Sequence, residues 1–353
     1  MASSNPDRGP GPVNPPRSRP GGRVVFAFDK FRGTATAAEL VAAGVAAAVE
    51  GGWRARGVPV ADGGEGSLAA IGGANKRSEV ADPLGRPVTA GWRLEGRHAF
   101  IEMAAASGVG LVADVGNDPV NASTTGTGQL ITTAIELGAR TVTVFLGGSA
   151  TTDGGWGALE AMPPRARMAE IELVAATDVT TRFLDAADVF GPQKGASPAQ
   201  VALLRRRLER LAQVYADDYG VDVTDRAGAG AAGGLAGGLL AVGGRIEPGF
   251  EVVADEAGLF DALEEADLVV TGEGLLDDQS FQGKVVGGVT TLAADVDVPV
   301  LAVVGSRAEG VAVPAGVRVV DLAARFGLEE ARRRPVELVA RVVAEHLAGP
   351  GAG

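Results

Sequence analysis

Carboxylates stand among glycines in three short tracts of this 353-residue sequence. The tracts are Ala61-Asp62-Gly63-Gly64-Glu65-Gly66, Thr151-Thr152-Asp153-Gly154-Gly155, and Thr271-Gly272-Glu273-Gly274, with Asp277, Asp278 and Lys284 further along the last one. Glycine lets the backbone approach a ligand closely, and carboxylate oxygens are ligands that Mg²⁺ prefers. Each acid by itself is also a common turn former. Taken together, the tracts predict a phosphate-handling enzyme in which a divalent cation neutralises converging carboxylates.

The few lysines of the sequence also indicate where phosphate binds. Lysines are four of the 32 basic residues, at Lys30, Lys76, Lys194 and Lys284. An ammonium is a compact point charge that can follow a phosphoryl group, whereas a guanidinium prefers a planar, bidentate partner. We therefore expect Lys194 and Lys284, each beside glycine, to contact phosphate, and Lys76 to lie on the solvated surface.

Composition excludes several classes of function. The net charge of −12 argues against broad binding to nucleic acid or anionic membranes, because both need a basic face. The absence of cysteine rules out disulfides, a thiolate nucleophile and a zinc-thiolate site. No apolar run is long enough to cross a bilayer, and the first 22 residues lack the apolar segment of a secretory signal. These features predict a cytoplasmic protein without nucleic-acid or membrane partners.

The two ends of the chain predict one α/β sheet. Residues 1–22 are rich in Pro, Gly, Ser and Arg and are expected to be a disordered tail. Residues 23–28 form an apolar run typical of a buried strand, and Thr36-Ala37-Ala38-Glu39 is a capping box that begins a helix. Strands are expected again near the C-terminus, interleaved with helices. A doubly wound, flavodoxin-like sheet follows from this alternation.

The middle of the chain predicts a second domain, because the length exceeds what one core usually supports. Residues 88–94 and 98–103 favour a hairpin, and Ser197-Pro198-Ala199-Gln200 begins a long helix. The tract 228–244 fits either a tightly packed helix or a ligand loop. The predicted division is a discontinuous flavodoxin-like domain at 23–81 and 256–353, with an inserted α/β domain at 82–255.

The glycine loop at 147–155 could surround an anion with backbone amides. It is not a P-loop, and no dinucleotide fingerprint accompanies it, so neither motif identifies a cofactor. His98 and His346 lack a motif around them and are expected to be structural.

In its ordered motifs the chain resembles the bacterial glycerate kinases of the first type. The motifs run from Phe28-Asp29-Lys30-Phe31-Arg32-Gly33-Thr34 and the Asp62 tract through Asp82-Pro83-Leu84-Gly85-Arg86-Pro87, Ile101-Glu102-Met103-Ala104, Thr124-Thr125-Gly126-Thr127-Gly128, 147–155, 191–195 and 228–234 to 271–284. The resemblance covers about residues 23–347. It implies Mg²⁺-assisted, ATP-dependent phosphorylation of D-glycerate, usually at the 2-hydroxyl, on a flavodoxin-like domain with an inserted α/β domain. It leaves a homodimer open.

Two departures from the family pattern stand out. The family usually has lysine where Arg32 stands and serine where Lys30 stands, so the loop keeps a cation at a shifted position. The family also usually has a longer stretch between the Asp153 tract and Gly191, which predicts a smaller tip for the second domain.

Phosphoryl transfer needs a positioned substrate, neutralised phosphate charge and a base, and we expect the following residues to provide them. Asp62, Asp153 and Lys284 are the candidate catalytic residues, with either aspartate as base. Glu273 and Asp277 are the candidate Mg²⁺ ligands. Substrate contacts are expected from Asp29, Lys30, Arg32, Ser149 and Thr151, and phosphate or nucleotide contacts from Gly63, Gly64, Lys194, Gly272 and Gly274.

Two alternatives stay open from the sequence. A kinase for another small hydroxy acid would need the same phosphate machinery. A metabolite-sensing module without catalysis would need a ligand site but no metal ligands.

Overall fold

The structure is a computed structural model that describes residues 21–281 and 283–349. The predicted tail at 1–22 therefore lies outside the described residues, apart from Gly21 and Gly22. The chain divides into two compact units. Within the described residues, unit 1 comprises 21–58, 260–278 and 289–349, and unit 2 comprises 59–259, 279–281 and 283–288. Residues 59–81, which the sequence analysis grouped with the flavodoxin-like domain, belong to unit 2 in this division, because their strand pairs within the unit 2 sheet.

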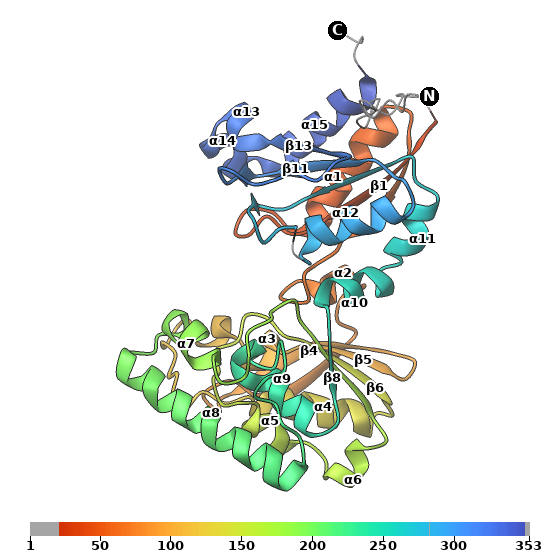
Figure 1. The fold of residues 1–353 in the computed structure, drawn as a ribbon. Helices are drawn as coiled ribbons and strands as arrows, with labels where there is room; N and C mark the ends of the chain where they lie inside the picture. Colours follow the sequence, from red (N-terminus) through yellow and green to blue (C-terminus); the bar gives the residue numbers. More distant parts are fainter. Residues whose placement is uncertain (1–20, 282, 350–353) are drawn as a thin grey trace, which may run out of the picture. The chain divides into compact units, whose positions relative to one another are not determined.

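Unit 1 contains a fully parallel, five-stranded sheet in the order β2-β1-β9-β11-β13 (Figure 1). Numbered along the unit, this is the flavodoxin order 2-1-3-4-5. The strands are β1 (Arg23–Phe28), β2 (Arg54–Gly57), β9 (Leu268–Gly272), β11 (Val300–Val304) and β13 (Val317–Asp321). A short pair, β10 (Leu275–Leu276) and β12 (Ser306–Arg307), follows two of these strands.

Helices lie on both faces of this sheet, as the α/β alternation predicts. They are α1 (Ala37–Glu50), α11 (Leu259–Glu264), α12 (Val285–Asp295), α13 (Leu322–Phe326), α14 (Leu328–Arg333) and α15 (Pro335–Ala348). The helix α1 begins at the predicted capping box, in which Glu39 N donates to Thr36 Oγ1 and Thr36 N to Glu39 Oε2. It packs against α15 on one face of the sheet, with Phe26 and Leu40 in the shared core. Figure 1 shows α12 on the other face.

Unit 2 is a mixed, six-stranded sheet in the order β3-β4-β5-β6-β7-β8. Its strands are β3 (Lys76–Ala81), β4 (Pro87–Glu95), β5 (His98–Glu102), β6 (Thr141–Phe145), β7 (Glu172–Ala176) and β8 (Arg245–Glu247). The predicted hairpin is present as the antiparallel pair β4 and β5. From β5 to β8 the strands are parallel, so their carboxyl ends meet at one edge.

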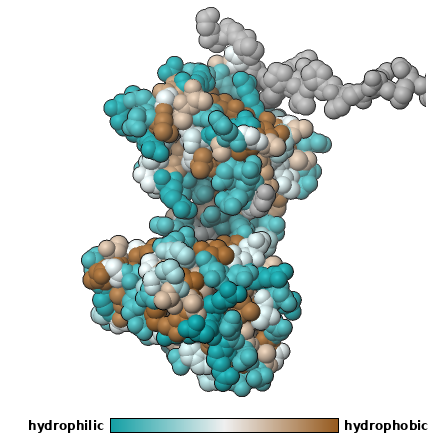
Figure 2. All heavy atoms as spheres, turned by 60° about the vertical axis from the view of Figure 1, so that its left-hand side comes forward, coloured by the Kyte–Doolittle hydropathy of each residue, from teal (hydrophilic) through white to brown (hydrophobic). Residues whose placement is uncertain are grey.

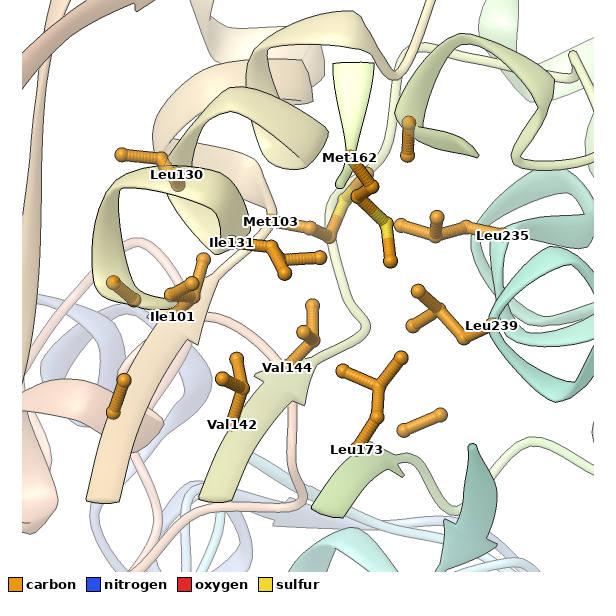
Figure 3. Packing of buried hydrophobic residues seen from close by; sticks show 14 of the residues in the cluster. Ile101, Met103, Leu130, Ile131, Val142, Val144, Met162, Leu173, Leu235 and Leu239 are labelled. Carbon is orange, nitrogen blue, oxygen red and sulfur yellow. The ribbon is translucent and has the colours of Figure 1, made fainter. Parts of the chain in front are cut away.

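The helices of unit 2 complete its core. They are α2 (Ser67–Ala70), α3 (Ala104–Ser107), α4 (Thr125–Glu136), α5 (Trp156–Ala161), α6 (Arg165–Met168), α7 (Ala186–Phe190), α8 (Pro198–Tyr219), α9 (Ala231–Ala241) and α10 (Gly249–Glu256), with the 3₁₀ turns η1 (Val109–Val112) and η2 (Pro192–Lys194). Figure 3 shows Ile131 of α4 and Leu239 of α9 packed with Val144 and Leu173 of the sheet. Apolar residues recur at helical spacing along α8, at Val201, Leu204, Leu208, Leu211 and Tyr215. Of these, Leu204, Leu208 and Tyr215 are buried.

Hydrophilic and hydrophobic side chains are interspersed on the visible face of each unit (Figure 2). Among the described residues, no helix combines the length and apolar character needed to cross a bilayer.

Candidate active site

The sheet of unit 1 has its switch point between β1 and β9, where open α/β sheets bind ligands beyond the carboxyl ends of the strands. The segment after β1 and the segment after β9 lie side by side there. Asp29 N donates to Gly272 O at 3.0 Å. A Cβ built on Gly274 would stand 3.4 Å from both Arg32 N and Phe31 Cα. The sequence-predicted residues of these two segments therefore share one edge of one sheet.

The loop after β1 presents its polar side chains from a closed turn. Phe31 N and Ala35 N donate to each other's carbonyl oxygens at 2.8 and 3.0 Å, which closes the turn around Arg32. Lys30 N donates to Asp29 Oδ1 at 2.7 Å. Asp29, Lys30 and Arg32 are thus held at the switch point by local backbone geometry.

The loop after β9 combines a packing glycine with acidic groups. A Cβ on Gly272 would stand 1.9 Å from Val303 O, so glycine is required there by the neighbouring strand β11. Gly272 therefore has a packing reason independent of any ligand. Glu273 follows immediately and is 9% exposed, whereas Asp277 follows β10 and is half-buried.

These residues fit a magnesium ion by the chemistry of their oxygens. Thr271 Oγ1 is buried and has no hydrogen-bond partner within residues 21–281 and 283–349, and Glu273 and Asp277 add carboxylates in the same segment. No group of three or more His, Asp or Glu side chains able to hold a metal occurs in the part of the chain that the structure describes. Mg²⁺ needs only one or two carboxylates when substrate phosphates and water complete its shell. The donor set is therefore compatible with a shared metal–phosphate site.

In unit 2 the Asp62 tract lies across the carboxyl ends of the parallel strands. A Cβ on Gly63 would stand 2.5 Å from Gly249 Cα, just after β8. A Cβ on Gly147, after β6, would stand 2.6 Å from Gly64 Cα. At the end of β5, Glu102 Oε1 accepts hydrogen bonds from Gly66 N and Leu68 N at 2.9 and 2.8 Å. The glycines of this tract thus allow close backbone contacts, which explains Gly63 and Gly64 without a ligand.

Asp62 acts through its charge on a second carboxylate, Asp178, which follows β7 at the same edge. Asp178 accepts hydrogen bonds from Gly249 N at 2.8 Å and Phe250 N at 3.2 Å, at the start of α10. Burial, with a further contribution from the charge of Asp62, raises the pKa of Asp178 to about 7. Asp62 itself accepts one hydrogen bond within the described chain, from Gly64 N at 3.2 Å. This arrangement leaves acceptor capacity on Asp62 and a carboxyl group that changes charge near neutral pH.

Asp153 has a different environment, because its oxygens are heavily used within the protein. Oδ2 accepts hydrogen bonds from Thr124 N and Thr124 Oγ1, both at 2.8 Å, and from Gly157 N at 3.3 Å. Oδ1 accepts one from Gly155 N at 3.1 Å. The carboxylate therefore joins the start of α4 to the start of α5. This geometry favours a structural anchor over a base.

Lys194 is enclosed in unit 2, next to the loop that carries Thr151. Its side chain is 5% exposed, and Nζ donates to Thr151 O at 2.5 Å. Burial lowers the pKa of Lys194 to about 7, although the charge of Asp153 acts in the opposite direction. Ser149, in the same loop, is half-buried and forms an antiparallel bridge with Gly108. The structure thus brings Lys194 and Thr151 together.

Lys284 comes from another part of unit 2 and precedes α12. Its Nζ donates to Gln279 Oε1 at 3.2 Å, and its side chain is half-buried. The two histidines agree with the expected structural roles. His98 hydrogen-bonds through Nε2 with Thr143 Oγ1 at 2.9 Å, and burial lowers the pKa of both His98 and His346.

Sequence reasoning missed two residues of these environments. Asp178 has no adjacent glycine and so lies outside the pattern of acids among glycines, although its place shortly after a strand was a usable signal. Asn117 donates through Nδ2 to Ala150 O and Lys194 O, both at 2.9 Å. Nothing in its local sequence indicates this contact, which spans 77 positions to Lys194.

Comparison with known proteins gives one consistent result. The sequence model of the "Glycerate kinase family" matches residues 24–165 and 162–345. The "Glycerate 2-kinase" of Escherichia coli (strain K12) is 37% identical over 336 residues, which cover 82% of this chain and 87% of that protein. The "Glycerate kinase" of Haemophilus influenzae is 35% identical over 332 residues, covering 81% and 86%. A crystal structure described as "putative glycerate kinase 2 from Salmonella typhimurium LT2" superposes with a TM-score of 0.77 at 33% identity, covering 93% of this chain and 99% of that one.

Proposed function

The chain belongs to the glycerate kinase family, and we propose that it transfers the γ-phosphoryl group of ATP to the 2-hydroxyl of D-glycerate with the help of Mg²⁺. Members of this family are kinases whose acceptor is an alcohol. The relative named "Glycerate 2-kinase" supports the choice of hydroxyl. Family membership also disfavours the alternative of a sensing module without catalysis. The cytoplasmic location and the homodimer stay predictions.

The observation that carries this proposal is the pair Asp62 and Asp178 at the carboxyl edge of the unit 2 sheet. An attacking hydroxyl must lose its proton, and a base works best when its pKa lies near the operating pH. Asp178 meets this condition, because burial, with a smaller contribution from the charge of Asp62, raises its pKa to about 7. We propose that this pair accepts the proton of the acceptor hydroxyl. Asp62 contacts the hydroxyl, and Asp178 acts on Asp62 through its charge.

The switch point of unit 1 supplies the groups proposed for the phosphates. Lys30 and Arg32 offer positive charge from the loop after β1, beside the backbone of Gly274. Glu273 and Asp277 would hold Mg²⁺, which when bound neutralises phosphate charge. Lys284, which precedes α12, is a further candidate for phosphate contact. These residues need only bind and orient the phosphates, because phosphoryl transfer requires little covalent chemistry from the protein.

The proposal is tested by identifying the product. We expect ³¹P NMR of the enzyme with ATP, Mg²⁺ and D-glycerate to show 2-phosphoglycerate and ADP accumulating together. A 3-phosphoglycerate signal would refute the choice of hydroxyl but keep the kinase activity. If no phosphate ester forms with D-glycerate while another small hydroxy acid is phosphorylated, the substrate assignment is wrong.

A further inference from the structure

Unit 2 contains a cluster of buried polar groups whose hydrogen-bonding capacity is only partly used. Lys194 carries three ammonium donors, and within the described chain Nζ has one hydrogen bond, to Thr151 O. Thr151 and Thr152 are 0% and 1% exposed, and neither Oγ1 has a hydrogen-bond partner in the part of the chain that the structure describes. Buried polar side chains usually have at least one partner, so this concentration needs an explanation.

The cluster is held together by contacts from three separate segments. Asn117 Nδ2 donates to Ala150 O and Lys194 O, which fixes the side chain against both the 150–152 loop and η2. Its Oδ1 atom is buried and has no hydrogen-bond partner among the described residues. Gly233 packs on the same loop, because a Cβ there would stand 2.0 Å from Thr151 O. The partly used groups therefore belong to one rigid environment rather than to mobile surface side chains.

The chemistry of this cluster favours an anion. An ammonium with unused donors and two buried hydroxyls can donate to a carboxylate or a phosphoryl group, which accept hydrogen bonds only. Asn117 Oδ1 could in turn accept from a ligand hydroxyl. Asp153 is the charged side chain that acts on Lys194, and its own oxygens are used by Thr124, Gly155 and Gly157. The ammonium is therefore only partly compensated within the protein.

We propose that Lys194, Thr151, Thr152 and Asn117 form a subsite that receives an anionic oxygen group of the reaction's ligands. The group is either the carboxylate of the hydroxy acid or a phosphoryl oxygen of the nucleotide. This inference rests on the proposed function. It brings Lys194 and Thr151, for which the sequence predicts ligand contacts, into one subsite and adds Thr152 and Asn117 to them. Lys194 acts as a direct ligand contact, and Asn117 positions it.

Proton uptake on binding gives a readout that a purely structural lysine would not produce. Burial lowers the pKa of free Lys194 to about 7, so at about pH 8 most of the ammonium has lost its proton. An anion bound beside it favours the charged form, and binding must then take up a proton. Calorimetric titration at about pH 8 in two buffers of different ionisation enthalpy measures that uptake. D-glycerate and ADP are titrated separately, so the ligand that causes uptake identifies the anionic group.

For the ligand that occupies the subsite, we expect uptake of roughly half a proton or more. The Lys194→Met variant should lose this uptake and bind that ligand about tenfold more weakly or worse. Lys76→Met is the matched control, because it removes an exposed lysine outside the cluster, and it should retain the uptake. Uptake that is absent with both ligands, or unchanged in Lys194→Met, would overturn the proposal.

Thr151→Val and Thr152→Val provide a second test that does not depend on the lysine. Each change removes a buried hydroxyl with nearly the same shape. If the hydroxyls donate to the ligand, affinity should fall several-fold while the fold is retained. If affinity is unchanged in both variants, the hydroxyls have no part in the subsite. If wild type forms the product in the NMR experiment but proton uptake is absent and affinity is unchanged in these variants, the subsite is refuted while the proposed function is retained.

Discussion

The two units use acidic residues at the ends of their strands in different ways. At the switch point of unit 1, two loops after adjacent strands place Glu273 beside a turn that carries Lys30 and Arg32. At the edge of unit 2, the Asp62 tract covers several strand ends. The carboxylate oxygens of some acids there already accept hydrogen bonds from backbone N–H groups. The same local pattern, an acid among glycines, therefore produces both a candidate base and a structural anchor. What separates them is the number of hydrogen bonds that each carboxylate receives.

The largest expected effect comes from Asp62→Asn. The amide can still accept from Gly64 N but cannot take up the hydroxyl proton, so we expect kcat to fall about 100-fold or more. The free energy of unfolding should change by less than about 0.5 kcal/mol. Steady-state kinetics and urea unfolding measure the two quantities. Asp225→Asn, at an exposed position, serves as the control, and near-normal turnover of Asp62→Asn would remove it from the role of base.

Asp153→Ala should show the opposite signature, a loss of stability. The change leaves the backbone N–H groups of Thr124, Gly155 and Gly157 without their acceptor. We therefore expect the free energy of unfolding to fall by about 3 kcal/mol. Urea unfolding of unit 2, followed by tryptophan fluorescence, measures this loss. If the variant unfolds like wild type but has lost turnover, Asp153 belongs with the catalytic residues, as the sequence first indicated.

A smaller effect distinguishes the glycines that permit close packing from those that only form turns. Gly63 and Gly73 both have positive φ, of 78° and 76°, so alanine costs about 1 kcal/mol of backbone strain at either position. At Gly63 the new Cβ would also meet Gly249 Cα at 2.5 Å, whereas nothing lies within 4 Å at Gly73. We expect Gly63→Ala to lose about 1–3 kcal/mol more stability than Gly73→Ala in thermal unfolding. Equal losses would contradict the close packing of the Asp62 tract.

Local signals allowed much of the fold to be predicted. The capping box at Thr36 and Glu39, the buried run of β1 and the apolar stripe of α8 depend on neighbours in the sequence, and each is present in the structure. The α/β fold is likewise confirmed by the sheets and by the solved relative.

The tract 228–244 shows why other parts could not be predicted. It contains the helix α9, but Ala232, Gly233 and Gly234 adopt positive φ before the regular part of that helix. The reason is distant in sequence, since Gly234 must fit against Gly154 Cα, which a Cβ would approach to 2.8 Å. Asp178 was missed for a similar reason, because its importance comes from Asp62 and the start of α10 rather than from its neighbours.

The pH dependence of kcat in wild type and in Asp178→Asn tests the central claim, that the Asp62–Asp178 pair takes the proton of the acceptor hydroxyl. Asp178 gains its negative charge near pH 7, and this charge favours transfer of the hydroxyl proton to the pair, so wild-type kcat should rise with pH through about 7 and then level off. Asp178→Asn removes the group that changes charge near pH 7, so the kcat of this variant should lose the inflection. An inflection that stays at the wild-type position in this variant would contradict the account.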